Sequence, residues 1–232
     1  CPICMLRFPT LTGGRTYMNC CGKTICSGCV YAFRSRVTKK KDDVCPFCRT
    51  SMPTSAEEIM KRLKKRMEVN DAHAMINMGC HYAGGQFGLP QNMAKALELW
   101  HRAGEFGHAK AYYNIGQAYK FGRGVERDEK MAIHYYELAA MGGSLFARHN
   151  LGANSSAGYM DRALKHFMMA ASDGYFDSLK SIKLFYKKGD ATKDDYAKAL
   201  RSYQAYLEEI KSDQRDEAAA FNDENKYYKS AA

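Results

Sequence analysis

The first 48 residues of the chain hold eight cysteines, whose thiols can bind metal ions, form disulfides or act as nucleophiles. They fall into four close pairs: Cys1 and Cys4, Cys20 and Cys21, Cys26 and Cys29, and Cys45 and Cys48. A structural zinc ion takes four ligands in a tetrahedron, and a tight turn between two cysteines lets both reach one ion. The four pairs therefore predict two structural zinc sites.

A disulfide framework is the alternative interpretation of these cysteines. It needs an oxidising compartment, and the ninth cysteine, Cys80, would be left unpaired. The paired spacing favours zinc. Because so short a segment, rich in Gly, Thr and Lys, cannot bury enough apolar surface to fold alone, the metal would supply its folding energy. Chelation should then unfold it.

The residues between the pairs carry a family resemblance. The stretches CPICMLRF, CCGKTICSGCV and CPFCR resemble a RING domain of ubiquitin ligases, over residues 1–52. The resemblance implies a cross-brace, in which the first and third pairs share one zinc ion and the second and fourth pairs share the other. The two ligand sets would be Cys1, Cys4, Cys26 and Cys29, and Cys20, Cys21, Cys45 and Cys48.

One position departs from the family pattern. Lys23 stands where the family has a histidine ligand, and an ammonium group has no lone pair to offer a metal. Cys20 would replace that histidine, giving an all-cysteine second site. Two adjacent cysteines on one ion need an unusual turn, so a strained or weaker second site is the expectation.

The resemblance also implies an activity without a catalytic nucleophile on this chain. A RING domain binds a ubiquitin-conjugating enzyme and holds its ubiquitin thioester in a reactive orientation. The matching contact positions are Ile3, Pro46, Phe47 and Arg49. The alternative is structural: Ile3 and Phe47 would fill the small core, and Arg49 would be a solvated charge.

From about residue 70 the sequence repeats. An apolar residue follows four positions after each of Ala74, Ala111 and Ala147, and a glycine follows five positions after each. The three alanines are 37 and then 36 residues apart. A second series pairs an alanine with an aromatic residue four positions later: Ala96 and Trp100, Ala132 and Tyr136, Ala163 and Phe167, Ala199 and Tyr203. The fourth unit is the most divergent, with Lys183 in place of the glycine. Such units predict antiparallel helix pairs stacked into an α-solenoid.

The stretch AYYNIGQAYKFGRGVERDEKMAIHYYELAAMGG resembles the Sel-1-like repeat, a relative of the tetratricopeptide repeat. Four copies would cover about 70–210, and the resemblance implies a platform for a protein partner or substrate. The repeated alanines, glycines and aromatics are interpreted as packing. Neighbouring positions such as Tyr112, Tyr113 and Arg148 are candidate partner contacts, although packing against the next repeat is the commoner role. Cys80 is expected to be a buried small hydrophobe.

The predicted fold class is therefore mainly α, with a small cross-brace two-zinc RING module followed by an α/α solenoid of about four Sel-1-like repeats. The predicted division is a zinc-binding domain in residues 1–53, a basic helical linker in 54–69, the solenoid in 70–211, and a capping helix or flexible tail in 212–232. A chain of 232 residues with 46% hydrophobic residues is long enough for these parts.

The net charge of +10 is concentrated near the N-terminus. Residues 1–68 hold 14 Lys and Arg against 5 Asp and Glu, with basic runs at 39–41 and 61–66. Ser55 and Glu58 predict a capping box that begins a helix before the second run. A solvated helix face is the simplest interpretation, and steering of an acidic conjugating enzyme is a further hypothesis. Nucleic acid is not expected as a partner, because aromatics for base stacking are missing from the basic segment.

Targeting signals give little information. No run of 18 apolar residues predicts a membrane span. Because the chain begins on a cysteine, upstream sequence is expected, and any targeting segment would lie there. Reduced thiolates predict the cytoplasm or the nucleus, where the sequon at Asn154 would stay unmodified.

Two functions are consistent with these features. The first is a RING-type ubiquitin ligase that presents protein substrates on its solenoid. The alternative is a non-catalytic zinc-containing adaptor that holds proteins together through both modules. The step from solenoid to substrate binding rests on fold analogy.

Overall fold

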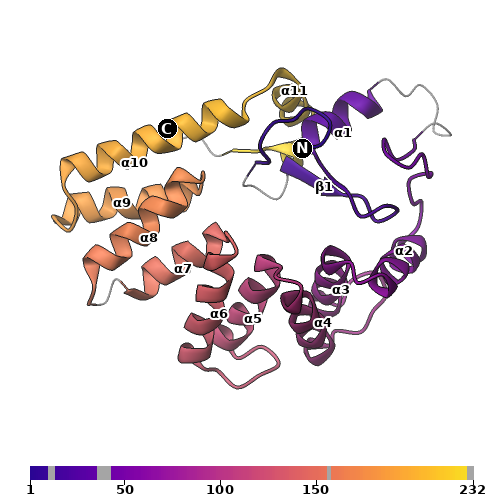
Figure 1. Ribbon diagram of the computed structural model, residues 1–232, viewed down its shortest axis with the longest axis horizontal. Helices are drawn as coiled ribbons and strands as arrows, with labels where there is room; N and C mark the ends of the chain where they lie inside the picture. The colour runs from indigo at the N-terminus through magenta and orange to yellow at the C-terminus, as the bar shows by residue number, and fades with distance from the viewer. Residues whose placement is uncertain (10–13, 36–42, 156–157, 229–232) are drawn as a thin grey trace. The chain divides into compact units, whose positions relative to one another are not determined.

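A computed structural model describes residues 1–9, 14–35, 43–155 and 158–228 (Figure 1). The described residues form a two-stranded sheet, eleven α-helices and one 3-10 turn. The first elements are β1 (Arg15–Tyr17), β2 (Thr24–Cys26), α1 (Ser27–Arg34) and α2 (Ala56–Glu68). The later helices are α3 (Ala72–Gly84), α4 (Met93–Glu105), α5 (Ala109–Phe121), α6 (Glu129–Met141), α7 (Leu145–Ser155), α8 (Met160–Ser172), α9 (Phe176–Lys188), α10 (Lys193–Ile210), α11 (Asp213–Phe221) and η3 (Asp223–Asn225).

The chain divides into two compact units. The terminal unit comprises Cys1–Thr16, Thr24–Lys40 and Arg148–Ala232, and the central unit comprises Tyr17–Lys23 and Lys41–Ala147. Both units draw on the cysteine-rich segment. The predicted domain division at residues 53, 69 and 211 stays a prediction.

The helices pair as the repeat pattern predicted. In the central unit α3 packs on α4, α4 on α5, and α5 on α6; in the terminal unit α8 packs on α9 and α10. Helices α4, α6 and α10 begin at polar caps, since Asn92, Asp128 and Thr192 each accept a backbone N–H of the first turn. The predicted mainly helical solenoid is confirmed.

The repeated glycine and aromatic positions explain how closely the paired helices approach. A Cβ atom placed on Gly79 would lie 2.5 Å from Trp100, and on Gly116 it would lie 2.7 Å from the Tyr136 ring. These contacts are shorter than real Cβ atoms tolerate, so glycine on the first helix makes room for the aromatic ring of the second. In the divergent fourth unit, Lys183 stands at the position of this glycine, and its side chain is exposed.

The residues beside the repeated alanines pack against neighbouring helices. Tyr113 has its ring 6.0 Å from that of Tyr136 and 5.7 Å from that of Phe146, and Tyr112 is part of the core around α3 to α5. In the terminal unit Arg148 Nη1 lies 2.8 Å from the sulfur of Met169 on α8. All three side chains are half-buried, so part of each packs within the solenoid.

Helix α2 carries the second basic run. Ser55 Oγ accepts the N–H of Glu58 at 3.2 Å, so the predicted helix start is confirmed, although the Glu58 carboxylate accepts the N–H of Thr54 at 3.2 Å rather than that of Ser55. Met60 and Leu63 are buried, whereas the lysines of the run are exposed. The run at 39–41 lies outside the described residues.

The segment after the last repeat forms a helix. Within the segment 212–232, predicted to be a capping helix or a flexible tail, Asp213–Phe221 form α11, which packs on α1 within the terminal unit. That this segment caps the solenoid stays a prediction. None of the helices in the described part of the chain is long and apolar enough to cross a membrane.

Candidate metal centres and a pocket in the solenoid

The structure brings the eight N-terminal cysteines together in two groups of four. The first group is Cys1, Cys4, Cys26 and Cys29, and the second group is Cys20, Cys21, Cys45 and Cys48. Within each group all sulfur atoms lie within 4.8 Å of one another. These are the two sets that the RING resemblance implied. All four members of the first group belong to the terminal unit, and all four of the second belong to the central unit.

The sulfur spacing fits a tetrahedral thiolate-bound metal. In the first group, Sγ of Cys1 and Cys29 are 3.8 Å apart, as are those of Cys4 and Cys26. A zinc ion with Zn–S bonds of about 2.3 Å separates its sulfur ligands by about 3.8 Å. A disulfide would join two sulfur atoms at about 2 Å. The first group therefore has the spacing of a zinc site and not of two disulfides.

The second group fits nearly as well. Sγ of Cys21 and Cys45 are 3.8 Å apart, and those of Cys48 and Cys20 are 3.4 Å apart. The shorter pair contains Cys20, the residue proposed to replace the family's histidine. Lys23 takes no part in the group: its ammonium lies 4.8 Å from the Phe47 ring centroid, in a cation–π contact.

The pair Cys1 and Cys4 and the pair Cys45 and Cys48 are held by the same type of backbone turn. Met5 donates its N–H to the Cys1 carbonyl at 2.9 Å, and Arg49 donates to the Cys45 carbonyl at 3.0 Å. Met5 and Arg49 have left-handed φ angles of 58° and 60°. This tight turn aims two sulfur atoms at one point.

The adjacent cysteines use the turn differently. Gly22, with a φ of 76°, donates its N–H to the Met18 carbonyl at 2.8 Å, so Met18 occupies the place of the first cysteine and Cys21 that of the second. Cys20 adds its sulfur from inside the turn. The geometry therefore explains how two adjacent cysteines can face one site.

Without a bound cation, the thiolate form would be disfavoured at several of these cysteines. Burial, and then the neighbouring Cys26 thiol, raise the pKa of Cys29 to about 12. Burial and the thiols of Cys48 and Cys45 also raise the pKa of Cys20. Crowded thiolates repel one another, and a divalent cation reverses this penalty. At Cys48 burial is outweighed by hydrogen bonds from Thr50, and the pKa falls to about 6.

A polar network beside the second group joins it to the first repeat. Tyr17 donates its hydroxyl to Asp71 Oδ2 at 2.8 Å, and Arg66 donates to the same oxygen at 2.7 and 2.9 Å. Asp71 Oδ1 also accepts the N–H groups of His73 and Ala74, which begin α3. The same carboxylate thus holds the cysteine-rich segment, the basic helix α2 and the first repeat.

Asp71→Asn is expected to destabilise the protein by about 1–3 kcal/mol at pH 7, because it keeps a helix cap but removes a half-buried charge from two donors. Burial raises the pKa of Asp71, but Arg66, Tyr17 and the N–H of Ala74 together lower it below its ordinary value. Its contribution is therefore complete above the unfolded value and is lost as the pH falls through the folded value. Urea titrations should show wild type and variant converging below about pH 4.

The matched control is Asp194→Asn. The side chain of Asp194 is 86% exposed and lies 3.9 Å from Arg201, so its removal should leave the urea midpoint nearly unchanged. A stability gap for Asp71→Asn that is the same at pH 7 and pH 3 would contradict the electrostatic explanation.

The predicted contact residues lie near the surface. Ile3 is 46% exposed and Arg49 is exposed, while Pro46 and Phe47 are half-buried. Ile3 therefore does not fill a core. Ile3 belongs to the terminal unit and the other three to the central unit.

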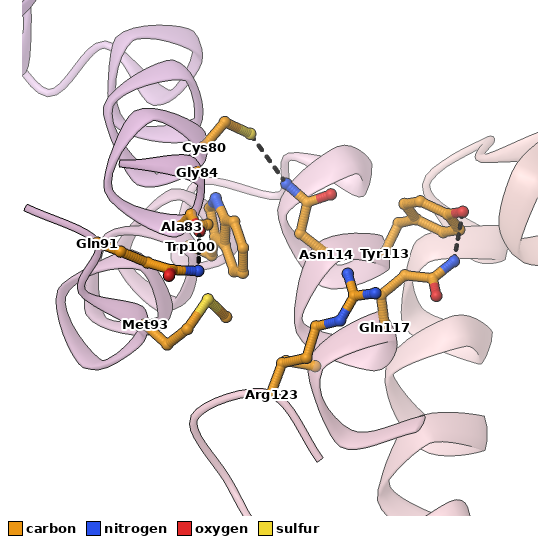
Figure 2. A pocket seen from close by; sticks show the side chains of 11 residues that line it. Cys80, Ala83, Gly84, Gln91, Met93, Trp100, Tyr113, Asn114, Gln117 and Arg123 are labelled. Carbon is orange, nitrogen blue, oxygen red and sulfur yellow. Dashed lines mark hydrogen bonds between the residues drawn. The ribbon is translucent and has the colours of Figure 1, made fainter. Parts of the chain in front are cut away.

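A pocket of about 630 Å³ lies within the central unit, between the first and second repeats. Figure 2 shows Trp100, Gln91 and Met93 on one side of it and Asn114, Gln117 and Arg123 on the other. Asn114 donates to Cys80 Sγ at 3.6 Å, and Gln91 donates to the Ala83 carbonyl at 3.0 Å. The pocket therefore combines an apolar wall with amide groups and one guanidinium.

Sequence reasoning missed this pocket. Its polar members Tyr113, Asn114 and Gln117 share one face of α5, a spacing that could have been noticed. Cys80, predicted to be a buried hydrophobe, is half-buried at the pocket wall.

The comparisons with known proteins identify the solenoid. A family model described as Sel1 repeat matches residues 72–108 and 109–144. Human protein sel-1 homolog 2 is 29% identical over 96 residues, covering 41% of this chain and 14% of that protein. An uncharacterised protein of Neisseria meningitidis serogroup B is 33% identical over 151 residues, covering 64% of this chain and 31% of that protein. The chain thus spans less than a third of either relative.

Solved structures agree on the fold. A Sel1 repeat protein from Oxalobacter formigenes has a TM-score of 0.58 and 28% identity, covering 78% of this chain and 70% of that one. A protective antigen of uropathogenic Escherichia coli with an SLR fold also has a TM-score of 0.58, at 21% identity, covering 77% of this chain and 36% of that one. The chain therefore contains Sel1 repeats, which form a helical solenoid after its cysteine-rich segment.

Proposed function

We propose that this protein is a scaffold that binds a protein partner on its Sel1 repeats and is stabilised by two structural zinc ions. The pocket between the first two repeats is the observation that carries the proposal. Zinc would be held by the eight cysteine sulfurs, in the groupings described above. When bound, it supplies a fixed tetrahedral cross-link and no chemistry on a substrate. Because the ligands are thiolates, we propose a reducing compartment, the cytoplasm or the nucleus.

The chemistry of the pocket favours a segment of polypeptide. Amides at Gln91, Asn114 and Gln117 offer donors and acceptors that match a peptide backbone, and the Trp100 side provides an apolar surface. Arg123 is exposed at the pocket and adds a positive charge, so an acidic side chain in the bound segment would be favoured. A pocket of this size holds a few residues of an extended chain.

A displayed peptide library tests the scaffold proposal. Selected peptides should change the emission of Trp100, the single tryptophan of the chain, and Arg123→Glu should weaken their binding at least tenfold. Arg102→Glu is the matched control, because Arg102 is exposed on α4 and lies outside the pocket. If neither Arg123→Glu nor Asn114→Ala changes the affinity of the selected peptides, the partner binds elsewhere and the proposal is contradicted.

A RING-type ubiquitin ligase is the second candidate function. The cysteine groups have the cross-brace pairing, and the side chains of Ile3 and Arg49 are accessible rather than buried. The accessibility of these side chains, each within its own unit, supports the proposal that they contact a ubiquitin-conjugating enzyme. In this proposal the partner on the solenoid is the substrate, and the chain contributes orientation rather than a nucleophile.

Discharge of ubiquitin from a panel of charged conjugating enzymes tests the ligase proposal. Discharge by the wild type that falls at least tenfold in both Ile3→Ala and Arg49→Ala, with zinc content and stability retained, would support it. Arg34→Ala is a suitable charge control, since Arg34 ends α1 and lies outside the matched contact positions. If a fully metallated chain discharges ubiquitin from no enzyme of the panel, the ligase proposal fails and only the scaffold proposal remains.

A further inference from the structure

The strongest unexplained feature of the terminal unit is a fully buried arginine. Arg215 on α11 is 0% exposed. Its Nη2 group donates to the Arg7 carbonyl at 2.9 Å and its Nη1 group to the Ile210 carbonyl, while Nε is buried without a hydrogen-bond partner. Among the described residues no carboxylate pairs with this guanidinium. A buried charge of this kind is costly unless an anion compensates it.

The nearest candidate anion is the first cysteine group. Arg215 Nη2 lies 4.0 Å from the sulfur of Cys4, and the side-chain oxygen Oε1 of Gln214 lies 3.9 Å from the sulfur of Cys29. Four thiolates around one divalent ion carry a net charge of about −2, so the guanidinium would neutralise half of it. Neutral thiols or disulfides at this group would leave Arg215 without a counter-charge.

Residues around Arg215 contact the chain beside both cysteine pairs of the first group. On the side of Cys1 and Cys4, Arg215 binds the Arg7 carbonyl, and the Arg7 guanidinium pairs with Glu209 on α10 at 3.1 Å. On the side of Cys26 and Cys29, a Cβ on Gly28 would lie 2.8 Å from the Arg215 backbone nitrogen. Only a residue without a side chain lets α11 approach the first turn of α1 so closely.

Contacts continue beyond Arg215. Ser27 donates its hydroxyl to the Asn225 carbonyl at 3.4 Å, and the rings of Tyr31 and Phe221 lie 5.4 Å apart. The Tyr227 ring, 1% exposed, lies 6.0 Å from the Arg215 guanidinium carbon. The C-terminal segment, residues 213–228, is therefore built onto the first cysteine group.

The second group has a different set of cations. Arg62, Lys65 and Arg66 line a small hollow beside Cys20 in the central unit. Arg66 is already paired with Asp71, Arg62 is paired with Glu58, and Lys65 is exposed. Each of the three cations is either paired with a carboxylate or exposed, unlike Arg215. The second group therefore serves as a comparison for the first within the same protein.

We propose that Arg215 is a positioning residue for the metal of the first cysteine group, and that metal retention there and folding of residues 213–228 are coupled. The proposal rests on the metal assignment made under the proposed function. The guanidinium stabilises the thiolate cluster, and the metallated cluster supplies the anion that allows Arg215 to be buried. Metal loss at the first group should therefore release α11, while metal loss at the second should not.

Metal transfer to a chromogenic chelator tests the coupling on the full chain loaded with zinc. Arg215→Met should speed release from the first group by about 10- to 100-fold and leave the second group unchanged. The release phases are assigned with Cys26→Ser and Cys45→Ser, each of which removes one group. Arg215→Lys, which keeps the charge, should restore part of the retention, and Arg201→Met is the control, since Arg201 is 67% exposed on α10.

Hydrogen exchange of the wild type gives a second readout that needs no variant at position 215. Protection of α11 should be lost on chelation while α5 and α6 stay protected. Unchanged release from the first group in Arg215→Met, equal acceleration at both groups, or persistent α11 protection after chelation would overturn the coupling. A chain that binds neither zinc nor cadmium would overturn the metal assignment itself and the coupling with it.

Discussion

Cys45→Ser is expected to remove the metal from the second cysteine group and to unfold the surrounding segment, while the first group keeps its ion. Cys45 is fully buried, and a serine hydroxyl does not ionise to replace a thiolate ligand. Structural zinc contributes on the order of 10 kcal/mol to small domains, so this loss exceeds that of any single packing contact. Zinc content should fall from two ions to one, and amide protection should be lost over residues 43–52.

The independence of the two groups follows from their placement. Each group of four cysteines lies wholly within one compact unit, so the two proposed ions would share no ligand segment. Cys80→Ser is the matched control, because Cys80 is a half-buried thiol outside both groups and should retain two ions. Loss of both ions in Cys45→Ser would mean that the groups fold as one.

Tyr136→Ala is expected to cost about 3–5 kcal/mol, the usual range for removing a large aromatic side chain from a core. The ring is fully buried against α5, where Gly116 leaves the space for it. Its removal leaves a cavity that the backbones of α5 and α6 cannot close, because both are fixed by their own hydrogen bonds. Urea or thermal unfolding of the metallated chain measures the loss.

Tyr136→Phe is the control that retains the ring, and it should change stability much less than the alanine variant. Gly116→Ala is the reciprocal test, since the added methyl group would meet the same ring at 2.7 Å. Equal stability of Tyr136→Ala and wild type would contradict the explanation that the repeat is stabilised by an aromatic ring packed against a glycine of the paired helix.

Much of the fold could be predicted from the sequence because its signals are periodic. The alanine, glycine and aromatic spacing gave the helix pairs, and the structure supplies the physical reason: Gly79 and Gly116 face Trp100 and Tyr136 at distances that exclude a Cβ. The cysteine spacing predicted four pairs, and the RING resemblance supplied how they combine. Short-range spacing alone leaves several pairings open.

Other features depend on contacts between residues far apart in the chain. Arg215 lies 211 positions from Cys4, and nothing in the local sequence around it marks a buried residue. Likewise, the polar residues of the pocket come from α5 and from the segments before and after it, so their convergence depends on how two repeats stack. The role of Met18 in the turn before Cys21 was also hidden, because methionine offers no family signature there.

Native mass spectrometry of the reduced full chain is the most direct test that each cysteine group holds its own zinc ion. The account predicts two zinc ions on the wild type, one on Cys45→Ser, one on Cys26→Ser and none on the double variant. A chain that is folded and metal-free, or whose cysteines are paired as disulfides, would contradict it.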